Sequence, residues 1–136
     1  MVQLIKIFLY LALLCILLYI RNMEQEYVDN WEAQVKKGIL SFIVLNILSR
    51  KHFYGYELMD EIQRVSTYNI AEGTLYPLLD RLKKDGLVTS EWVHQPSGVP
   101  RKYYYITRAG ESTLEIMNRY WLSLSSSINK VIRKNS

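Results

Sequence analysis

GTLYPLLDRLKKDGLV, residues 73–88, is the stretch that decides the fold of this chain. Spaced as a helix, it puts four leucines on one face at i, i+3, i+4 and i+7: Leu75, Leu78, Leu79 and Leu82. The opposite face carries a hydroxyl, a proline and two cations, with a tyrosine and a further lysine at its edges; these residues are Thr74, Pro77, Arg81 and Lys84, and Tyr76 and Lys83. Hydroxyls and cations contact phosphates and base edges. We therefore predict a helix, ended by Gly86 as C-cap, with one face buried and one face available to nucleic acid.

Two starting points for this helix are compatible with the sequence. Asn69 and Glu72 have the spacing of a capping box, which would start the helix at Asn69. That start places Pro77 deep inside the helix, where a proline removes a hydrogen bond and produces a kink. Alternatively, the regular helix begins near Thr74 and Pro77 lies harmlessly in its first turn.

Two further helices are predicted before residue 66. In the first, apolar and small residues recur at steps of three and four: Val28, Trp31, Val35, Gly38, Phe42 and Leu45. Residues 39–48 are apolar almost all round, which is typical of a buried helix. The second helix is shorter, and one face of it carries Tyr56, Met59, Ile62 and Val65.

A β-hairpin is predicted after residue 86. Residues 87–93 alternate like a half-exposed strand, and RKYYYI, residues 101–106, has the composition of a second strand. HQPSGVP between them is dense in turn formers. Three helices followed by a hairpin are the plan of a winged helix–turn–helix, in which the third helix enters the major groove and the wing contacts the backbone or minor groove. The predicted fold class is mainly α with a small β-hairpin.

Three motifs in this order resemble the PadR family of bacterial transcriptional regulators: YGYEL at 54–58, EGTLYPLLDRLKKDGLV at 72–88 and GVPRKYYYIT at 98–107. The resemblance covers residues 36–110 and implies a winged helix carried by a dimer that binds operator DNA, usually as a repressor. It places Gly73, Thr74, Leu75, Tyr76 and Pro77 at the start of the recognition helix, and Arg101, Lys102 and Tyr103 in the wing strand. Ala71 departs from the family, which often has a capping Ser or Asn there.

The residues expected to contact DNA combine this resemblance with side-chain chemistry. Thr74 and Tyr76 can donate hydrogen bonds to phosphates or base edges, although Tyr76 also fits the interpretation of a half-buried packing residue. The cations can neutralise phosphates. The full predicted set is Gly73, Thr74, Tyr76, Pro77, Arg81, Lys84, Arg101, Lys102 and Tyr103.

Residues 107–136 are predicted to form a dimerisation helix with Thr107 as its N-cap. Apolar positions follow steps of three and four: Leu114, Met117, Trp121, Leu124, Ile128 and Val131. One small winged helix cannot bury so long a seam, so we expect a second copy of the chain to cover it. Such a homodimer, with long N- and C-terminal dimerisation helices, would present two recognition helices to a pseudo-palindromic site in double-stranded DNA.

The resemblance extends to multidrug-sensing members of the family, in which a tryptophan of the last helix lines a pore at the dimer interface. It implies that Trp121, with Tyr120 and Trp31, contacts a small planar hydrophobic ligand. Aromatic faces bind planar and cationic molecules well. The alternative is that Trp121 is simply part of the dimer core.

The first 22 residues differ in composition from the rest. From Leu4 to Ile20 the chain is apolar except for Lys6, a length at the lower limit for a membrane span. Either this segment anchors the protein with its DNA-binding domain, residues 23–106, in the cytoplasm, or translation begins at Met23 and the protein is an ordinary cytoplasmic one.

Composition narrows the function classes. The 136 residues carry a net charge of +4, and Cys15 is the single cysteine beside two histidines. We therefore expect neither an enzyme nor a metal or cofactor site. The leading prediction is a dimeric repressor released by a small hydrophobic or aromatic ligand. A winged helix that binds another protein and a membrane-tethered regulator are the alternatives.

Overall fold

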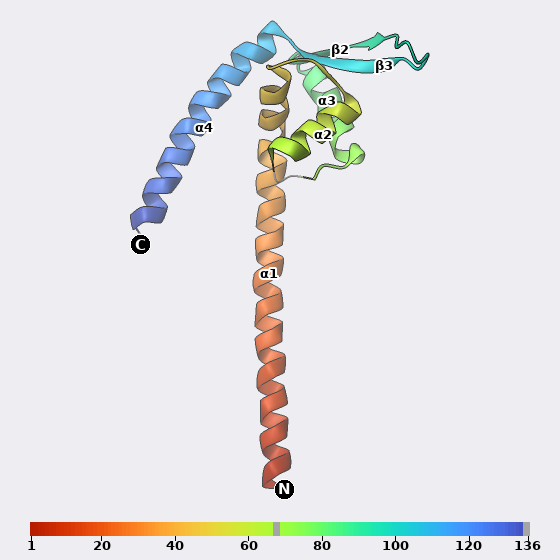
Figure 1. Cartoon of the computed structure of the whole chain (residues 1–136). Helices are drawn as coiled ribbons and strands as arrows, with labels where there is room; N and C mark the ends of the chain where they lie inside the picture. The colour runs from red at the N-terminus through yellow and green to blue at the C-terminus, as the bar shows by residue number, and fades with distance from the viewer. Residues whose placement is uncertain (67–68, 135–136) are drawn as a thin grey trace. The chain divides into compact units, whose positions relative to one another are not determined.

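The computed structural model describes residues 1–66 and 69–134. Its elements, in chain order, are α1 (Val2–Leu48), β1 (Phe53–Tyr54), α2 (Gly55–Val65), α3 (Glu72–Lys84), β2 (Val88–Val93), β3 (Arg101–Ile106) and α4 (Arg108–Lys134) (Figure 1). The chain divides into two units, Met1–Gly38 and Ile39–Ser136, which are described separately.

The core of the second unit forms around α3. All four predicted leucines of that helix are buried, as the sequence indicated. They belong to one apolar cluster with the end of α1, with α2, with the sheet and with the first turns of α4; the members outside α3 are Val44, Leu45, Ile47, Leu48, Phe53, Leu58, Ile62, Val88, Tyr104 and Leu114. The leucine face thus holds α3 in place and leaves its opposite face outside the core.

The start of α3 differs from both predictions. The helix begins at Glu72, and its N-cap is Ala71, whose side chain makes no capping bond. The carbonyl of Ala71 instead accepts the backbone N–H groups of Thr74 and Leu75, at 2.9 and 3.1 Å. The predicted capping box from Asn69 does not start the helix, and Pro77 lies inside it. Proline lacks the N–H that would bond to the carbonyl four residues earlier, so α3 lacks one ladder bond there.

The end of α3 agrees with the prediction for Gly86. This residue has a φ of +72°, which glycine adopts without steric cost. Its N–H bonds to the carbonyl of Lys83 at 3.0 Å, and that of Leu87 bonds to the carbonyl of Leu82 at 2.9 Å. This pair of bonds closes the helix and turns the chain into β2.

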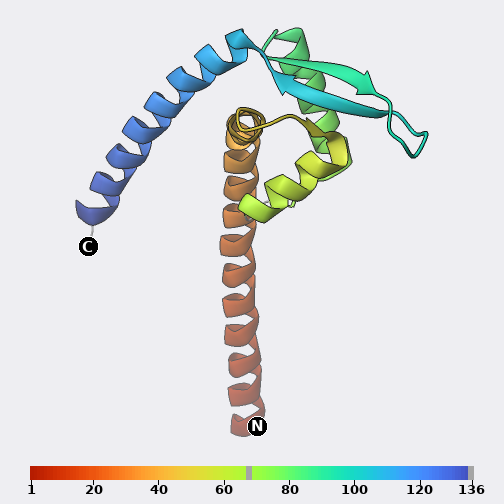
Figure 2. The same cartoon turned by 45° about the horizontal axis from the view of Figure 1, so that its top comes forward.

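The sheet has three antiparallel strands in the order β1-β3-β2, one more than the predicted hairpin. β3 pairs with β2 over its whole length and, on its other side, with Phe53 and Tyr54 of β1. Figure 2 shows β2 and β3 as a hairpin whose loop, residues 94–100, projects beyond the helices. This hairpin is the wing.

The predicted face of α2 is only partly buried. Ile62 is fully buried and Met59 packs against the core, as that face implies, but Tyr56 and Val65 are exposed and Leu58 is fully buried in their place. Because α2 begins immediately after β1, the Leu58 face is the one that meets α3 and the sheet.

Thr107 joins the end of α3 to the start of α4. Its hydroxyl donates to the carbonyl of Gly86 at 2.6 Å and accepts the N–H of Gly110 at 3.0 Å, which confirms it as the N-cap. A glycine at position 110 lets the first turn of α4 pack closely against Leu87 and Ile106. A Cβ there would lie 2.7 Å from Cγ1 of Ile106 and would collide with the carbonyl oxygen of Leu87.

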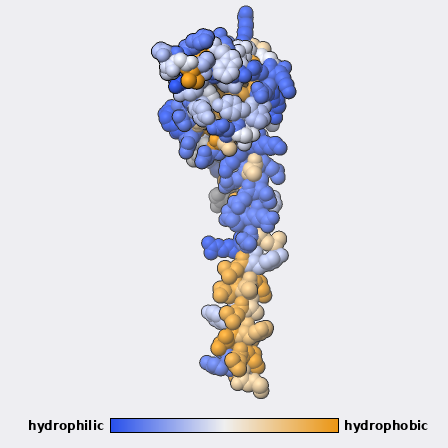
Figure 3. All heavy atoms as spheres, turned by 90° about the vertical axis from the view of Figure 1, so that its right-hand side faces the viewer, coloured by the Kyte–Doolittle hydropathy of each residue, from blue (hydrophilic) through white to orange (hydrophobic). Residues whose placement is uncertain are grey.

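In the first unit, α1 continues without a break through residues 22 and 23. The side chains from Leu4 to Ile20 are almost all exposed, and Figure 3 shows this segment as an apolar stretch followed by a hydrophilic one. Among the described residues, α1 is the one helix that is long and apolar enough to cross a membrane.

Candidate nucleic-acid interface

The outer face of α3 is polar, cationic and open to solvent. Gly73, Thr74, Pro77, Arg81 and Lys84 are all exposed, on the side opposite the buried leucines. Neither cation of this set forms an ion pair with another residue in the described part of the chain. The face therefore offers one hydroxyl and two cations without competing internal partners.

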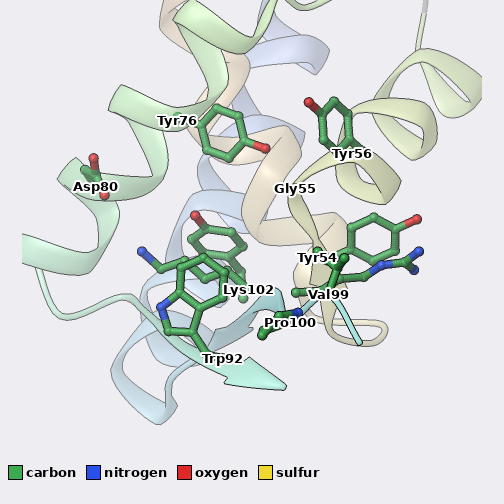
Figure 4. Close-up of a pocket in the computed structure, with 11 residues that line it drawn as sticks. Tyr54, Gly55, Tyr56, Tyr76, Asp80, Trp92, Val99, Pro100 and Lys102 are labelled. Atoms are coloured by element: carbon green, nitrogen blue, oxygen red, sulfur yellow. The ribbon is translucent and has the colours of Figure 1, made fainter. Parts of the chain in front are cut away.

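Tyr76 has a different environment from the rest of that set. It is half-buried, and Figure 4 shows its hydroxyl pointing toward Gly55 at the start of α2. Burial raises the pKa of this phenol, and the nearby Glu72 carboxylate and Tyr56 raise it further. Tyr56 also has a raised pKa, mainly because it hydrogen-bonds to Glu72. The geometry matches the packing interpretation of Tyr76.

The two wing cations lie on opposite faces of β3, because successive strand residues alternate. The Arg101 guanidinium is exposed and lies 4.4 Å from the centre of the Tyr54 ring. Lys102 is half-buried, with its Nζ 5.7 Å from the Trp92 ring and 6.0 Å from the Tyr104 ring. Each cation is thus positioned by an aromatic face and keeps its charge available for an anion.

Tyr103 belongs to a row of rings on the Arg101 face of the sheet. Its ring meets Tyr54 edge-on at 5.7 Å and His52 at 5.6 Å, and His52 stacks on Tyr105 at 5.0 Å. The Tyr105 hydroxyl donates to Glu91 at 2.6 Å, which raises the pKa of that phenol. Alternation along β3 puts Tyr103 and Tyr105 on this one face, and the tyrosine of the strand that lies in the core is Tyr104.

A cavity of about 730 Å³ lies between α3, the start of α2 and the wing (Figure 4). Its lining is rich in aromatic rings and also contains charged groups; the residues are Tyr54, Gly55, Tyr56, Tyr76, Asp80, Trp92, Val99, Pro100, Arg101, Lys102 and Tyr104. Sequence reasoning missed this cavity, because its walls come from segments that are far apart along the chain. The density of tyrosines at 54–56 and 103–105 was the available signal.

The residues predicted for dimerisation occupy three environments along α4. Leu114 is buried in the core of its own chain, and Met117 packs against that core. Trp121 is 40% exposed and lies 5.8 Å from Phe42 of α1, measured between ring centres. Leu124 is half-buried, whereas Ile128 and Val131 are exposed.

Of the other two residues predicted to bind an effector, Tyr120 is exposed on α4. Trp31 is an exposed residue of the first unit. The aromatic partner that the structure gives Trp121 is Phe42, which the sequence had marked only as part of an apolar seam.

Residues 44–116 match the profile of the transcriptional regulator PadR-like family, a span that contains α2, α3, the wing and the first turns of α4. The chain belongs to the PadR family. Members of this family regulate transcription and are not enzymes; they bind DNA and typically dimerise.

Individual PadR relatives agree with this assignment. The transcriptional regulator Rv3488 of Mycobacterium tuberculosis is 37% identical over 60% of this chain and 74% of its own length. A PadR-like transcription factor from Bacteroides fragilis has a solved structure with 37% identity and a TM-score of 0.64, covering 76% of this chain and 99% of that one. The structure of a PadR family regulator from Eggerthella lenta has 33% identity and a TM-score of 0.70, covering 79% and 94%.

Proposed function

We propose that this PadR regulator is a homodimeric repressor that binds a pseudo-palindromic operator and is released by a small hydrophobic or aromatic ligand. The proposed DNA binding is supported mainly by the orientation of α3. Its leucines are buried, so the opposite face presents Thr74, Arg81 and Lys84 to solvent. Hydroxyls and cations in that arrangement suit phosphates and the edges of bases in a major groove.

The proposed roles differ by position. Thr74 lies in the N-terminal part of the recognition helix, the part that contacts base edges in helix–turn–helix proteins. Arg81 and Lys84 lie toward its other end and are assigned to phosphates. Arg101 and Lys102 at the start of β3 are assigned to the phosphates next to the wing.

The proposed dimer is supported by the exposed apolar side chains of α4. Three residues of the predicted seam, which share one face of this helix, remain exposed on the single chain: Trp121, Ile128 and Val131. Exposed apolar surface of this kind marks interaction sites. A second copy is the partner that also gives two recognition helices for two half-sites about 34–36 Å apart.

Salt titration of DNA binding tests this function. Four proposed phosphate-binding cations per chain give eight per dimer, which predicts that log Kobs falls against log salt with a slope of about −7, at about −0.9 per phosphate. The probe is the DNA upstream of the protein's own gene, with a scrambled duplex as control. Weak binding with little salt dependence would contradict the proposal and favour a winged helix that binds another protein.

A membrane-tethered regulator is the second candidate, because the side chains of the apolar segment from Leu4 to Ile20 are nearly all exposed. Fractionation of cells that express the protein from its own upstream region decides between the two. A full-length chain in the membrane fraction supports tethering, with the winged helix on the cytoplasmic side. A product that begins at Met23 and stays in the soluble fraction supports an ordinary cytoplasmic regulator.

A further inference from the structure

We propose that Asp80 of α3 recognises a cytosine in each half-site of the operator, by accepting a hydrogen bond from the exocyclic N4 amine of that base. The proposal rests on the DNA-binding function proposed above and deepens it, because it assigns one base of the operator to one residue. Asp80 is absent from the set of residues that the sequence predicted to contact DNA, in which every charged member is a cation.

Asp80 lies on the face of α3 that points away from the core. Four exposed residues follow one another at steps of four, three and four, a spacing that puts side chains on one face of a helix: Gly73, Pro77, Asp80 and Lys84. Figure 4 shows the Asp80 carboxylate on the wall of the cavity that α3 forms, well away from Tyr56 at the start of α2. The face proposed to meet DNA therefore carries a carboxylate within it.

This carboxylate is available for an external partner. In the part of the chain that the structure describes, Asp80 forms no ion pair with a lysine or an arginine. The other acid of α3, Glu72, is already hydrogen-bonded to Tyr56. An unpaired carboxylate on this face would be repelled by the phosphates of any DNA sequence, which lowers the affinity unless the base edges compensate.

Only a base that donates a hydrogen bond can compensate, because a carboxylate only accepts. In the major groove the donors are N4 of cytosine and N6 of adenine, whereas guanine and thymine present acceptors. Adenine also presents its N7 acceptor beside the amine, and that lone pair repels a carboxylate oxygen. Cytosine is therefore the base that suits Asp80, and sequences without it are rejected by an uncompensated negative charge.

Selection of operators from a library of randomised duplexes tests the assignment. The wild-type chain is expected to enrich a palindrome with a cytosine at the assigned position of each half-site. Replacing that cytosine by thymine in one half-site exchanges the N4 donor for the O4 acceptor and keeps a pyrimidine. This replacement should weaken binding of the wild type about tenfold, the scale of one base-specific contact.

Asp80→Asn removes the charge, and its amide can both donate and accept. The variant should bind the cytosine and thymine duplexes with affinities within about twofold of each other, and should bind a scrambled duplex more tightly than the wild type does. Asp85→Asn is the matched control. It removes the same charge from the exposed C-cap of α3, outside the row of Asp80. It should keep the tenfold preference for cytosine.

The outcomes separate the role of Asp80 from the proposed function. A wild type that enriches a palindrome, together with an Asp80→Asn variant that enriches the same bases at every position, would overturn the role of Asp80 while the proposed function stands. An equal loss of preference in Asp85→Asn, or an affected position that is not cytosine, would also overturn it. A wild type that enriches no sequence would overturn the proposed function and the base assignment with it.

Discussion

The ring of Tyr76 occupies the space that any side chain at residue 55 would need. An ideal Cβ atom at Gly55 would lie 2.8 Å from Cζ and 2.9 Å from Cε1 of that tyrosine. Glycine at the start of α2 therefore allows α3 to approach the junction of β1 and α2. The contact holds Tyr76, one of the residues predicted to bind DNA, against the start of α2.

Gly55→Ala is expected to lower the free energy of unfolding by about 1–3 kcal/mol, the usual cost of overpacking a close contact. Urea unfolding measures the change. Gly38→Ala is the matched control, because nothing lies within 4 Å of a Cβ at that helical position. It should stabilise α1 by up to about 1 kcal/mol. Tyr76→Ala made together with Gly55→Ala should relieve most of the overpacking, and a failure to do so would place the strain elsewhere.

Arg101→Ala is expected to weaken binding to all duplexes and to reduce the magnitude of the salt slope by about one unit for each chain of the dimer. The reason is the loss of a phosphate contact that carries no sequence information. Arg119→Ala on α4 is the control, since it removes the same charge from an exposed position outside the proposed interface. An unchanged slope for Arg101→Ala would remove the wing from the DNA interface.

Thr107→Val is expected to destabilise the fold by about 1–2 kcal/mol. Valine keeps the shape of threonine but loses the hydroxyl that bonds to both Gly86 and Gly110. Thr107→Ser keeps the hydroxyl and should cost less than half as much. If the two variants unfold at the same urea concentration, the hydroxyl contributes nothing to stability.

The stability of the fold should fall as pH rises above about 10, partly because of Tyr104. Its pKa in the folded chain is raised above the ordinary 10.0 by burial. A raised pKa means that the full contribution is present below pH 10 and is lost as the pH rises through the folded value. Tyr104→Phe cannot ionise, so its stability should decline less between pH 9 and about 11. Urea unfolding across this range, compared with wild type, checks the sign.

The contact between Phe42 and Trp121 should be worth about 0.5–1.5 kcal/mol of coupling in a double-mutant cycle with alanine. The rings lie 5.8 Å apart and join α1 to α4 within one chain. Analytical ultracentrifugation of Trp121→Ala accompanies the cycle. A variant that remains dimeric is expected if Phe42 is the main partner, and monomers would show that Trp121 is essential to the dimer core.

The sequence predicted the parts of the fold that are marked by a regular spacing of apolar residues or by a helix-capping residue. The leucine face of α3, the stop of that helix at the left-handed Gly86 and the N-cap at Thr107 are all confirmed. It missed β1, because two residues are too short to show alternation, and that strand forms only by pairing with Tyr103 and Tyr104.

Errors arose where tertiary contacts override local signals. Asn69 and Glu72 have capping-box spacing, yet the backbone at Ala71 provides the start of α3. On α2, spacing alone could not show whether the face of Tyr56 or that of Leu58 is buried. The buried face is decided by the tertiary contacts of the helix, and it is the face of Leu58. The cavity was out of reach for the same reason, because it exists only where several separate segments meet.

The two faces of α3 can vary separately in evolution. The buried leucines specify how the helix sits, while Thr74, Pro77, Arg81 and Lys84 make no contribution to the apolar core. Exchanges at Thr74, a position proposed to contact base edges, should therefore alter which DNA sequence is preferred at little cost in folding. A gene duplicate could drift to a new set of target promoters through a few such exchanges, on an unchanged scaffold.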